Sequence, residues 1–146
     1  SIYGVTQPEE PGDAIVFTSI SQAYAEADAT GCAINYSVEF ENDEWQAAFE
    51  FCNDGGTGSQ ITADKYRCSS YVESGTGCGT QYRIVNKKTS ETLTLDEGSV
   101  TVAYADGVYD IDFDLMQTNG QHFKASYDGP IELDDYTSMG GGGYAR

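Results

Sequence analysis

The chain has 146 residues, enough for one domain with a substantial hydrophobic core. Its 24 acidic residues outnumber 7 basic ones and give a formal net charge of −17. This charge argues against binding to nucleic acid or to anionic membrane surfaces, because both partners attract Lys and Arg. No apolar run approaches the roughly 20 residues of a transmembrane helix. The sequence shows no signal-peptide pattern, which leaves room for a processing boundary or a lipid-bearing cysteine upstream of Ser1.

The N-terminal part of the chain is predicted to be a tail followed by a strand. Residues 1–13 contain two of the three prolines and show little periodicity, so we expect a linker or tail there. A single β domain is expected over residues 14–135. Its first strand is predicted from residue 15 to about residue 20, where β-prone side chains alternate. Residues 22–29 have a composition that also suits a helix, and the sequence leaves their state open.

A β-hairpin is predicted over residues 32–52. Apolar and polar side chains alternate on both sides of a turn at residues 42–44, and only a strand places each set on one face. Trp45 and Phe49 belong to the apolar set, so we expect them in the core rather than in a ligand platform.

The four cysteines, Cys32, Cys52, Cys68 and Cys78, form no CxxC or CxxH cluster. Zinc binding is therefore not expected, and the even number of cysteines indicates two disulfides and an oxidising compartment. Of the three pairings that four cysteines allow, we favour Cys68–Cys78, which closes a short Ser- and Gly-rich loop, together with Cys32–Cys52 across the hairpin. Each bond would stabilise the fold by roughly 2–4 kcal/mol. Four buried free thiols are the alternative.

The middle of the chain is predicted to consist of loops and short strands. Residues 53–62 form a Gly-rich loop that lacks the Lys-Ser/Thr pair and the helix of a phosphate-binding loop. Strands are expected at residues 65–72 and 81–85, and a short strand is expected to end at Leu93 and Leu95.

The clearest pattern lies in residues 99–133, where apolar side chains occupy every second position in four runs. Turn sequences such as Asp106-Gly107 and Asn119-Gly120 separate the runs. The segment is predicted to be an antiparallel meander with one buried face and one solvated face, followed by a Gly-rich tail over residues 136–146. In the second run we expect Tyr109, Ile111, Phe113 and Leu115 to face inward and Asp110, Asp112 and Asp114 to face outward.

Residues 98–129 combine a Gly, a V-T-V strand, an Asp-Gly turn, a Y-x-I-x-F-x-L strand, an Asn-Gly turn and the segment F-K-x-S-Y-x-G. This order resembles β-rich domains of cell-surface lipoproteins and other exported proteins of Bacteroidetes bacteria. A weaker likeness extends over residues 15–133, where residues 61–66 resemble that family's Pro-x-Gly-x-Tyr turn without its Pro and Gly. The resemblance implies an all-β exported domain. It carries no catalytic residues, and the cysteines are not part of its pattern.

Asp110, Asp112 and Asp114 are weak candidates for metal ligands. A Ca²⁺-binding loop of the D-x-D-x-D-G type needs Gly at the next position, whereas Leu115 follows here. We therefore expect these carboxylates to line the solvated face of a strand, with Lys124 as a partner across the hairpin.

Catalytic chemistry finds little support in the sequence. His122 is the only imidazole, and it follows a predicted turn, where a surface histidine is ordinary. No spacing selects a pair of carboxylates for glycoside hydrolysis. The protein is predicted not to be an enzyme and to need no cofactor.

The eleven tyrosines are more informative, because they do not all fit into a core of this size. An exposed tyrosine combines an apolar ring with a polar tip and suits recognition. Tyr24, Tyr71 and Tyr82 are the weak candidates for ligand contact, and cross-strand aromatic pairing is the alternative.

Together these observations predict an all-β fold, an antiparallel sandwich or small barrel of about eight strands built from hairpins and a meander. The expected function is a non-catalytic extracellular or cell-surface module that binds a glycan or a protein. The alternatives are a structural subunit of a surface filament or layer that self-assembles through its termini, and a secreted hydrolase. Neither a nucleic-acid partner nor a transmembrane segment is expected.

Overall fold

The computed structural model describes residues 14–29, 31–77 and 82–139, and within them the protein is all-β. Twelve strands and one short 3-10 helix make up its regular structure. The strands are β1 (Ile15–Phe17), β2 (Ser19–Ala29), β3 (Cys32–Glu41), β4 (Trp45–Cys52), β5 (Asp64–Cys68), β6 (Thr76–Gly77), β7 (Arg83–Asn86), β8 (Thr92–Leu93), β9 (Leu95–Ala105), β10 (Val108–Gln117), β11 (His122–Gly129) and β12 (Asp134–Tyr136), and the helix is η1 (Thr137–Met139).

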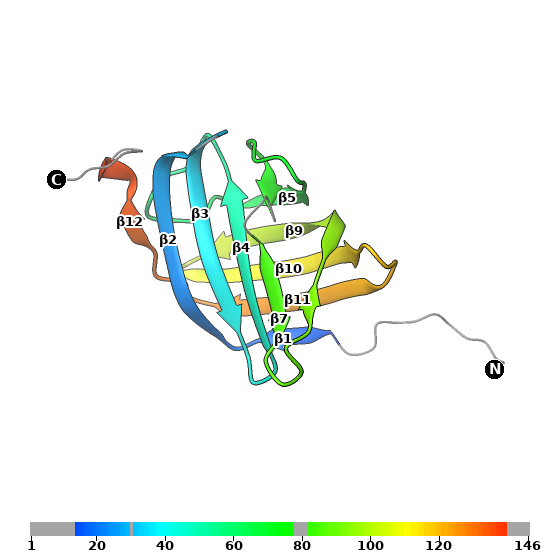
Figure 1. The fold of residues 1–146 in the computed structure, drawn as a ribbon. Helices are drawn as coiled ribbons and strands as arrows, with labels where there is room; N and C mark the ends of the chain where they lie inside the picture. Colours follow the sequence, from blue (N-terminus) through cyan, green and yellow to red (C-terminus); the bar gives the residue numbers. More distant parts are fainter. Residues whose placement is uncertain (1–13, 30, 78–81, 140–146) are drawn as a thin grey trace.

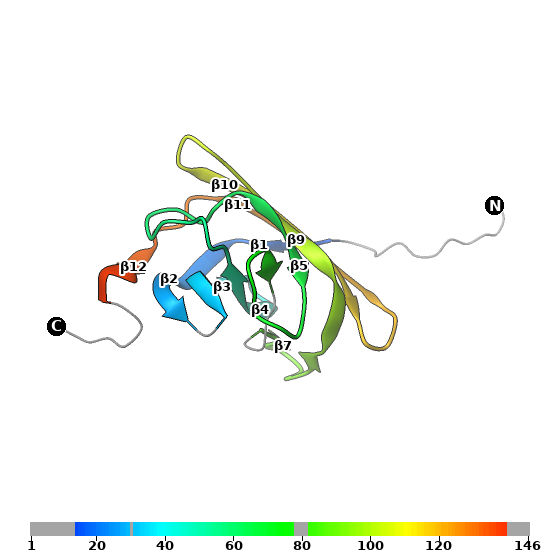
Figure 2. The same cartoon turned by 90° about the horizontal axis from the view of Figure 1, so that it is seen from above.

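All twelve strands belong to one mixed sheet that curls into a half-barrel. The strand order is β1-β11-β10-β9-β5-β6-β4-β3-β2-β12, with β7 beside β4 and β8 beside β7. Strands β2, β3, β4 and β7 form a front layer that crosses β9, β10 and β11 behind it (Figure 1). Seen from above, the two layers face each other across the interior (Figure 2).

The chain passes from one layer to the other through β1 and β2, which only Thr18 separates. Strand β1 pairs in parallel with β11, whereas β2 pairs in antiparallel fashion with β3. Strands β1 and β2, which lie near opposite ends of the strand order, are thus two parts of one bent segment of the chain. A bend of this kind forms the corner of an orthogonal sheet packing. The backbone N–H of Thr18 donates to the carbonyl of Glu41 at 2.8 Å, so the bend stays bonded to the hairpin.

The prediction of an all-β fold is confirmed, but the number and direction of the strands need correction. The structure has twelve strands instead of about eight, and three pairs are parallel: β1 with β11, β12 with β2, and β5 with β6. Each parallel pair includes a strand of two or three residues, which is too short to produce a period-two signal. Residues 22–29, whose state the sequence left open, belong to β2, because Ala23 and Ala25 face the core.

Several predicted strand boundaries also shift. The strand expected at 65–72 is β5 and ends at Cys68, and the one expected at 81–85 is β7. Leu95 begins the long strand β9 and does not end a short one. The last predicted run of the meander, at residues 131–133, has no strand pairing, although Ile131 is buried.

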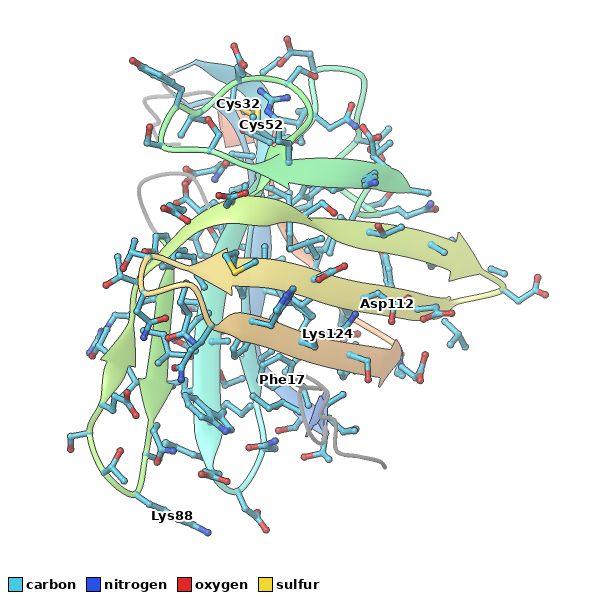
Figure 3. The ribbon with its side chains drawn as sticks, turned by 90° about the vertical axis from the view of Figure 1, so that its right-hand side faces the viewer. Phe17, Cys32, Cys52, Lys88, Asp112 and Lys124 are labelled. Atoms are coloured by element: carbon cyan, nitrogen blue, oxygen red, sulfur yellow. A yellow bond between two sulfur atoms is a disulfide. The ribbon has the colours of Figure 1, made fainter. Side chains whose placement is uncertain are left out.

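The β3–β4 hairpin has the predicted turn and the predicted disulfide. The side-chain Oδ1 of Asn42 accepts the backbone N–H groups of Glu44 and Trp45 at 2.8 and 2.7 Å, a local bond that favours a turn. Cys32 and Cys52 form a disulfide at the open end of the hairpin, with their Cα atoms 5.7 Å apart (Figure 3). Cys78 lies outside the described residues, so its bond to Cys68 stays a prediction.

The meander has the predicted register and faces. Strand β10 pairs with both β9 and β11, and its inward and outward residues alternate as expected. Asp106 and Gly107 both adopt positive φ angles, 53° and 84°, which is the backbone of a two-residue hairpin turn of type I′. At Gly98, a Cβ atom would overlap the carbonyl of Asp114, so the close approach of β9 and β10 there requires glycine.

An aromatic cluster fills the space between the two layers. It consists of Phe17 from β1, Phe40 and Phe49 from the front hairpin, and Phe113 and Tyr127 from the meander, each at most 5% exposed. The ring of Phe113 lies 5.1 Å from those of Phe40 and Phe49 and 5.5 Å from that of Phe17, centroid to centroid. Aromatic pairs at these separations add stabilisation beyond the area that they bury.

Three buried tyrosines attach the Gly-rich loop at residues 53–62 to the sheet. Their rings belong to the core and their hydroxyls reach the loop, which satisfies polar groups that would otherwise be buried without partners. The bonds run from the Tyr36 hydroxyl to the carbonyl of Thr57 (2.8 Å), from the Tyr66 hydroxyl to the carbonyl of Thr62 (2.6 Å), and from the N–H of Ile61 to the Tyr109 hydroxyl (2.9 Å).

Truncating Phe113 should be far more costly than truncating its neighbour in the strand. Phe113→Ala removes contacts with three rings and leaves a cavity, so we expect the free energy of unfolding to fall by roughly 3–5 kcal/mol. Asp112→Ala changes an exposed side chain and should alter it by no more than about 0.5 kcal/mol. Urea denaturation of both variants checks this, and an exchange of the two magnitudes would show that the register is shifted by one residue.

The second disulfide can be checked chemically. We expect Cys68 and Cys78 to be bonded, because their separation is short and rich in Ser and Gly. Intact mass with and without reductant, followed by peptide mapping under non-reducing conditions, should recover the two peptides joined. Alkylation of both thiols without reduction would contradict the pairing.

Candidate functional site

A groove of about 820 Å³ lies at one mouth of the half-barrel, where the front layer and the meander separate. Residues 20–23 of β2 form one side, and the segment 130–134 that follows β11 forms the other. Tyr104 and Gly107, at the β9–β10 turn, close one end. Ligand pockets commonly occupy the mouths of β-barrels and have volumes of roughly 300–1,000 Å³.

Tyr104 presents an aromatic ring to this groove. In register it lies opposite Tyr109, which is buried, so both side chains belong to the inner face of the sheet. The core ends at Tyr109, and Tyr104 is the next inner position toward the turn, with 36% of its surface exposed. The two ring centroids are 4.7 Å apart. Because the Tyr109 hydroxyl is itself bonded to the loop, Tyr104 rests on a fixed support.

Apolar side chains form the floor of the groove. Ala23, Tyr127 and Ile131 are buried there, and Ile20 is partly buried. The hydroxyl of Tyr127 donates to the carbonyl of Pro130 at 2.6 Å, which holds the start of the segment 130–134 against the sheet. Burial raises the pKa of Tyr127, so this hydroxyl remains a donor at neutral pH.

Polar side chains line the rim. Ser21 and Gln22 come from β2, and Glu132 and Asp134 come from the opposite segment. The groove therefore combines one aromatic face, an apolar floor and several hydrogen-bonding groups, of which two are carboxylates. Such a set can bind a ligand that has both apolar faces and hydroxyl or amine groups. No histidine, cysteine or basic residue is among its described lining residues.

The three tyrosines singled out in the sequence have different environments. Tyr82 is partly buried, and its hydroxyl accepts the N–H of Leu95 at 2.7 Å, which is a structural role. Tyr71 is 76% exposed on the loop after β5. Tyr24 packs beside Tyr136 with centroids 5.9 Å apart and lines a shallow hollow on the outer face of β2, β3 and β4. None of the three lines the mouth groove.

The three aspartates of β10 point away from the core, as predicted. The outer face of the meander carries Asp112 and Lys124 (Figure 3). Lys124 lies opposite Asp114, with its Nζ 3.8 Å from an Asp114 carboxylate oxygen, which confirms the expected pairing. Asp114 is also 4.0 Å from Nδ1 of His122. The three aspartates themselves are exposed and alternate along β10, and they are not part of the group of potential metal-binding side chains that the described residues contain.

Within the described part of the chain, one group of three potential metal-binding side chains was found, Cys32, Cys52 and Asp54. The two sulfur atoms are bonded to each other, so neither provides the thiolate that a metal requires. This group is therefore part of the disulfide and not a metal centre.

Sequence reasoning missed most of the groove. Tyr104 is one of the eleven tyrosines, but it is not one of the three that the sequence favours for ligand contact. The usable signal is its position as the last inward residue before the Asp106-Gly107 turn, where a strand passes beyond the layer that covers it. Glu132 and Gln22 carry no local signal, because only the fold brings residues 20–23 and 130–134 together.

Comparisons of the chain with protein-family models, with curated proteins and with solved structures found no match. Among the described residues, no helix has the length and apolarity to cross a membrane.

A cross-strand pair of like charges stands on the outer face of the meander. Asp110 lies directly opposite Asp128 in the β10–β11 register. The pKa of Asp110 is raised, chiefly by partial burial and then by the charges of Asp128 and Asp112. Since a raised pKa means that the ionised form is disfavoured in the folded state, this pair destabilises the protein above that pKa and is relieved as the pH falls through it.

Asp128→Asn should therefore stabilise the protein at pH 7. Like charges directly opposite each other on neighbouring strands cost a few tenths to about 1 kcal/mol, and the substitution removes this repulsion. The gain should shrink as the pH falls toward 3, because Asp110, whose pKa is raised, becomes protonated and no longer repels Asp128. Thermal unfolding at both pH values measures it, with Asp96→Asn as a control of equal charge change. A gain that is the same at both pH values would contradict the electrostatic origin.

Proposed function

We propose that the protein is a non-catalytic extracellular binding module that takes a saccharide in the mouth groove. The observation that carries this proposal is the exposed ring of Tyr104, held by Tyr109 at the end of an apolar floor with hydrogen-bonding side chains along the rim. A sugar ring has C–H groups on its faces and hydroxyls at its edges. An aromatic face beside carboxylate, amide and hydroxyl groups complements both.

The charge of the protein narrows the class of saccharide. Glu132 and Asp134 lie at the rim, and the whole chain carries a net charge of −17. A sulfated or uronic-acid sugar would meet repulsion from both. Neutral hexose chains and amino sugars fit better, because their hydroxyl and amine groups donate hydrogen bonds to carboxylates.

An exported location accords with this proposal. The Cys32–Cys52 disulfide is compatible with a secreted protein, because disulfides persist in oxidising compartments. The resemblance of residues 98–129 to domains of exported Bacteroidetes proteins points the same way. A protein ligand at the cell surface is the other partner that the same groove would accept. Self-assembly through the termini is expected from the sequence of residues 1–13 and 136–146. Tyr136 ends β12 and residues 137–139 form η1, whereas residues 1–13 and 140–146 lie outside the described residues, so self-assembly stays a prediction.

The test is binding of neutral and N-acetylated oligosaccharides by the whole chain, measured by a glycan array and then by calorimetry on the best ligand. Tyr104→Ala should weaken binding at least about tenfold, because it removes the aromatic face on which the ligand rests. Glu132→Gln should weaken it less, since an amide still accepts a hydrogen bond. Tyr71→Ala is the matched control, because it removes a more exposed tyrosine outside the groove.

Two results would contradict the proposal. One is that no member of the panel binds. The other is that Tyr71→Ala weakens binding while Tyr104→Ala, shown to be folded by circular dichroism, does not.

A further inference from the structure

The outer face of β2, β3 and β4 carries a compact group of oxygen-bearing side chains away from the mouth groove. This face is turned toward the viewer in Figure 1. In the register, Glu26 of β2 lies opposite Asn35 of β3, and Ser37 of β3 lies opposite Glu50 of β4. These four residues are neighbours on three adjacent strands and are called here the Glu26–Glu50 cluster.

Two carboxylates of the cluster act on each other across β3. The pKa of Glu50 is raised, first by burial and then by the negative charge of Glu26. Hydrogen bonds from the side chains of Asn35 and Ser37 to the Glu50 carboxylate oppose this shift without overcoming it. Among the described residues, no Lys or Arg is among the groups that shift the pKa of Glu50.

Asn35 supplies a second, independent observation. Its side chain is only 2% exposed, although it lies on the outer face beside Glu26. Its amide is directed at Glu50, and its Oδ1 atom is the buried side-chain oxygen or nitrogen without a hydrogen-bond partner among the described residues. A buried acceptor without a partner costs roughly 1–3 kcal/mol, so such an atom in a folded protein calls for a partner from outside the chain, which an ion or a water supplies.

We propose that the Glu26–Glu50 cluster binds one Ca²⁺ ion. The carboxylate oxygens of Glu26 and Glu50 and Oδ1 of Asn35 are its protein ligands, and water completes the shell. All are hard oxygen donors, which Ca²⁺ prefers, and Ca²⁺ tolerates an irregular shell with several waters better than Mg²⁺ does. The ion would neutralise the repulsion between the two acids and give the Asn35 oxygen its partner. This site is separate from the saccharide groove and does not depend on it.

The experiment measures thermal unfolding of the whole, chelator-treated protein with 10 mM CaCl₂, with 10 mM MgCl₂, and with NaCl at the same ionic strength. The NaCl sample removes the general screening that any salt gives to a protein of this charge. For a site with a dissociation constant of roughly 0.1–1 mM, typical of extracellular calcium sites, Ca²⁺ should raise the Tm by roughly 4–8 °C. Titration calorimetry should show one ion per chain.

Three variants locate the ion. Glu50→Gln and Glu26→Gln each remove one anionic ligand and should reduce the Ca²⁺-dependent shift to about 1 °C or less. Both should fold, and without Ca²⁺ their Tm should equal or exceed that of the unchanged protein, because each removes a repulsion. Asp112→Asn, in the exposed acidic row of β10, is the control of equal charge change and should keep the full shift.

The proposal is overturned if Ca²⁺ gives no more stabilisation than the matched NaCl. It is also overturned if Mg²⁺ is as effective as Ca²⁺, or if Glu50→Gln and Glu26→Gln keep the shift that Asp112→Asn keeps. The last result would show that the acidic surface as a whole attracts the ion.

Discussion

The packing of Phe17 against the rings of both layers is the contact on which the rest of the fold depends. Phe17 belongs to β1, which pairs with the meander, and its ring lies 5.6 Å from that of Phe40 in the front hairpin. After Thr18 the same chain enters β2 and joins the front layer. At the point where the chain changes layers, Phe17 therefore joins the direct contacts that Phe113 of the meander makes with Phe40 and Phe49 of the front hairpin.

The position of this aromatic cluster also decides where the interior is left open. Inward side chains beyond the cluster continue along β9 and β10 to Tyr109, which is buried, and to Tyr104, which is 36% exposed. Tyr109 has two tasks, since its hydroxyl holds the Gly-rich loop and its ring supports Tyr104. A groove with one supported aromatic ring thus follows from how the core is filled.

The sequence predicts the elements whose side chains alternate over many residues. The β3–β4 hairpin, its disulfide, and the faces of β10 follow from period-two patterning and from turn residues such as Asn42 and Asp106-Gly107. It predicts one strand over residues 15–20, where the structure has β1 and the start of β2. It does not predict β6 or β12, because a strand of two or three residues has no period to detect and exists only through its neighbours.

The candidate sites are the least predictable part, for the same reason. Tyr104 and Glu132 are far apart in the chain, and the Glu26–Glu50 cluster draws on three strands whose register sequence patterning alone does not fix. The sequence favours Tyr24, Tyr71 and Tyr82 for ligand contact because eleven tyrosines do not all fit into the core. It does not show where the core ends. Asn35 is a polar residue that alternates with apolar ones in its strand, so the sequence predicts that it is exposed. Nothing in the neighbouring residues indicates that it is buried on the outer face.

The central claim is that the core stops at Tyr109 and leaves a ligand-binding mouth. The most direct test is to map amide chemical shifts by NMR while the protein is titrated with an oligosaccharide that it binds. The account predicts the largest shift changes at residues 20–23, Tyr104, Gly107 and residues 131–134, with the outer face of β9, β10 and β11 unchanged. Changes centred on that outer face or on Tyr71, with none at the mouth, would contradict it.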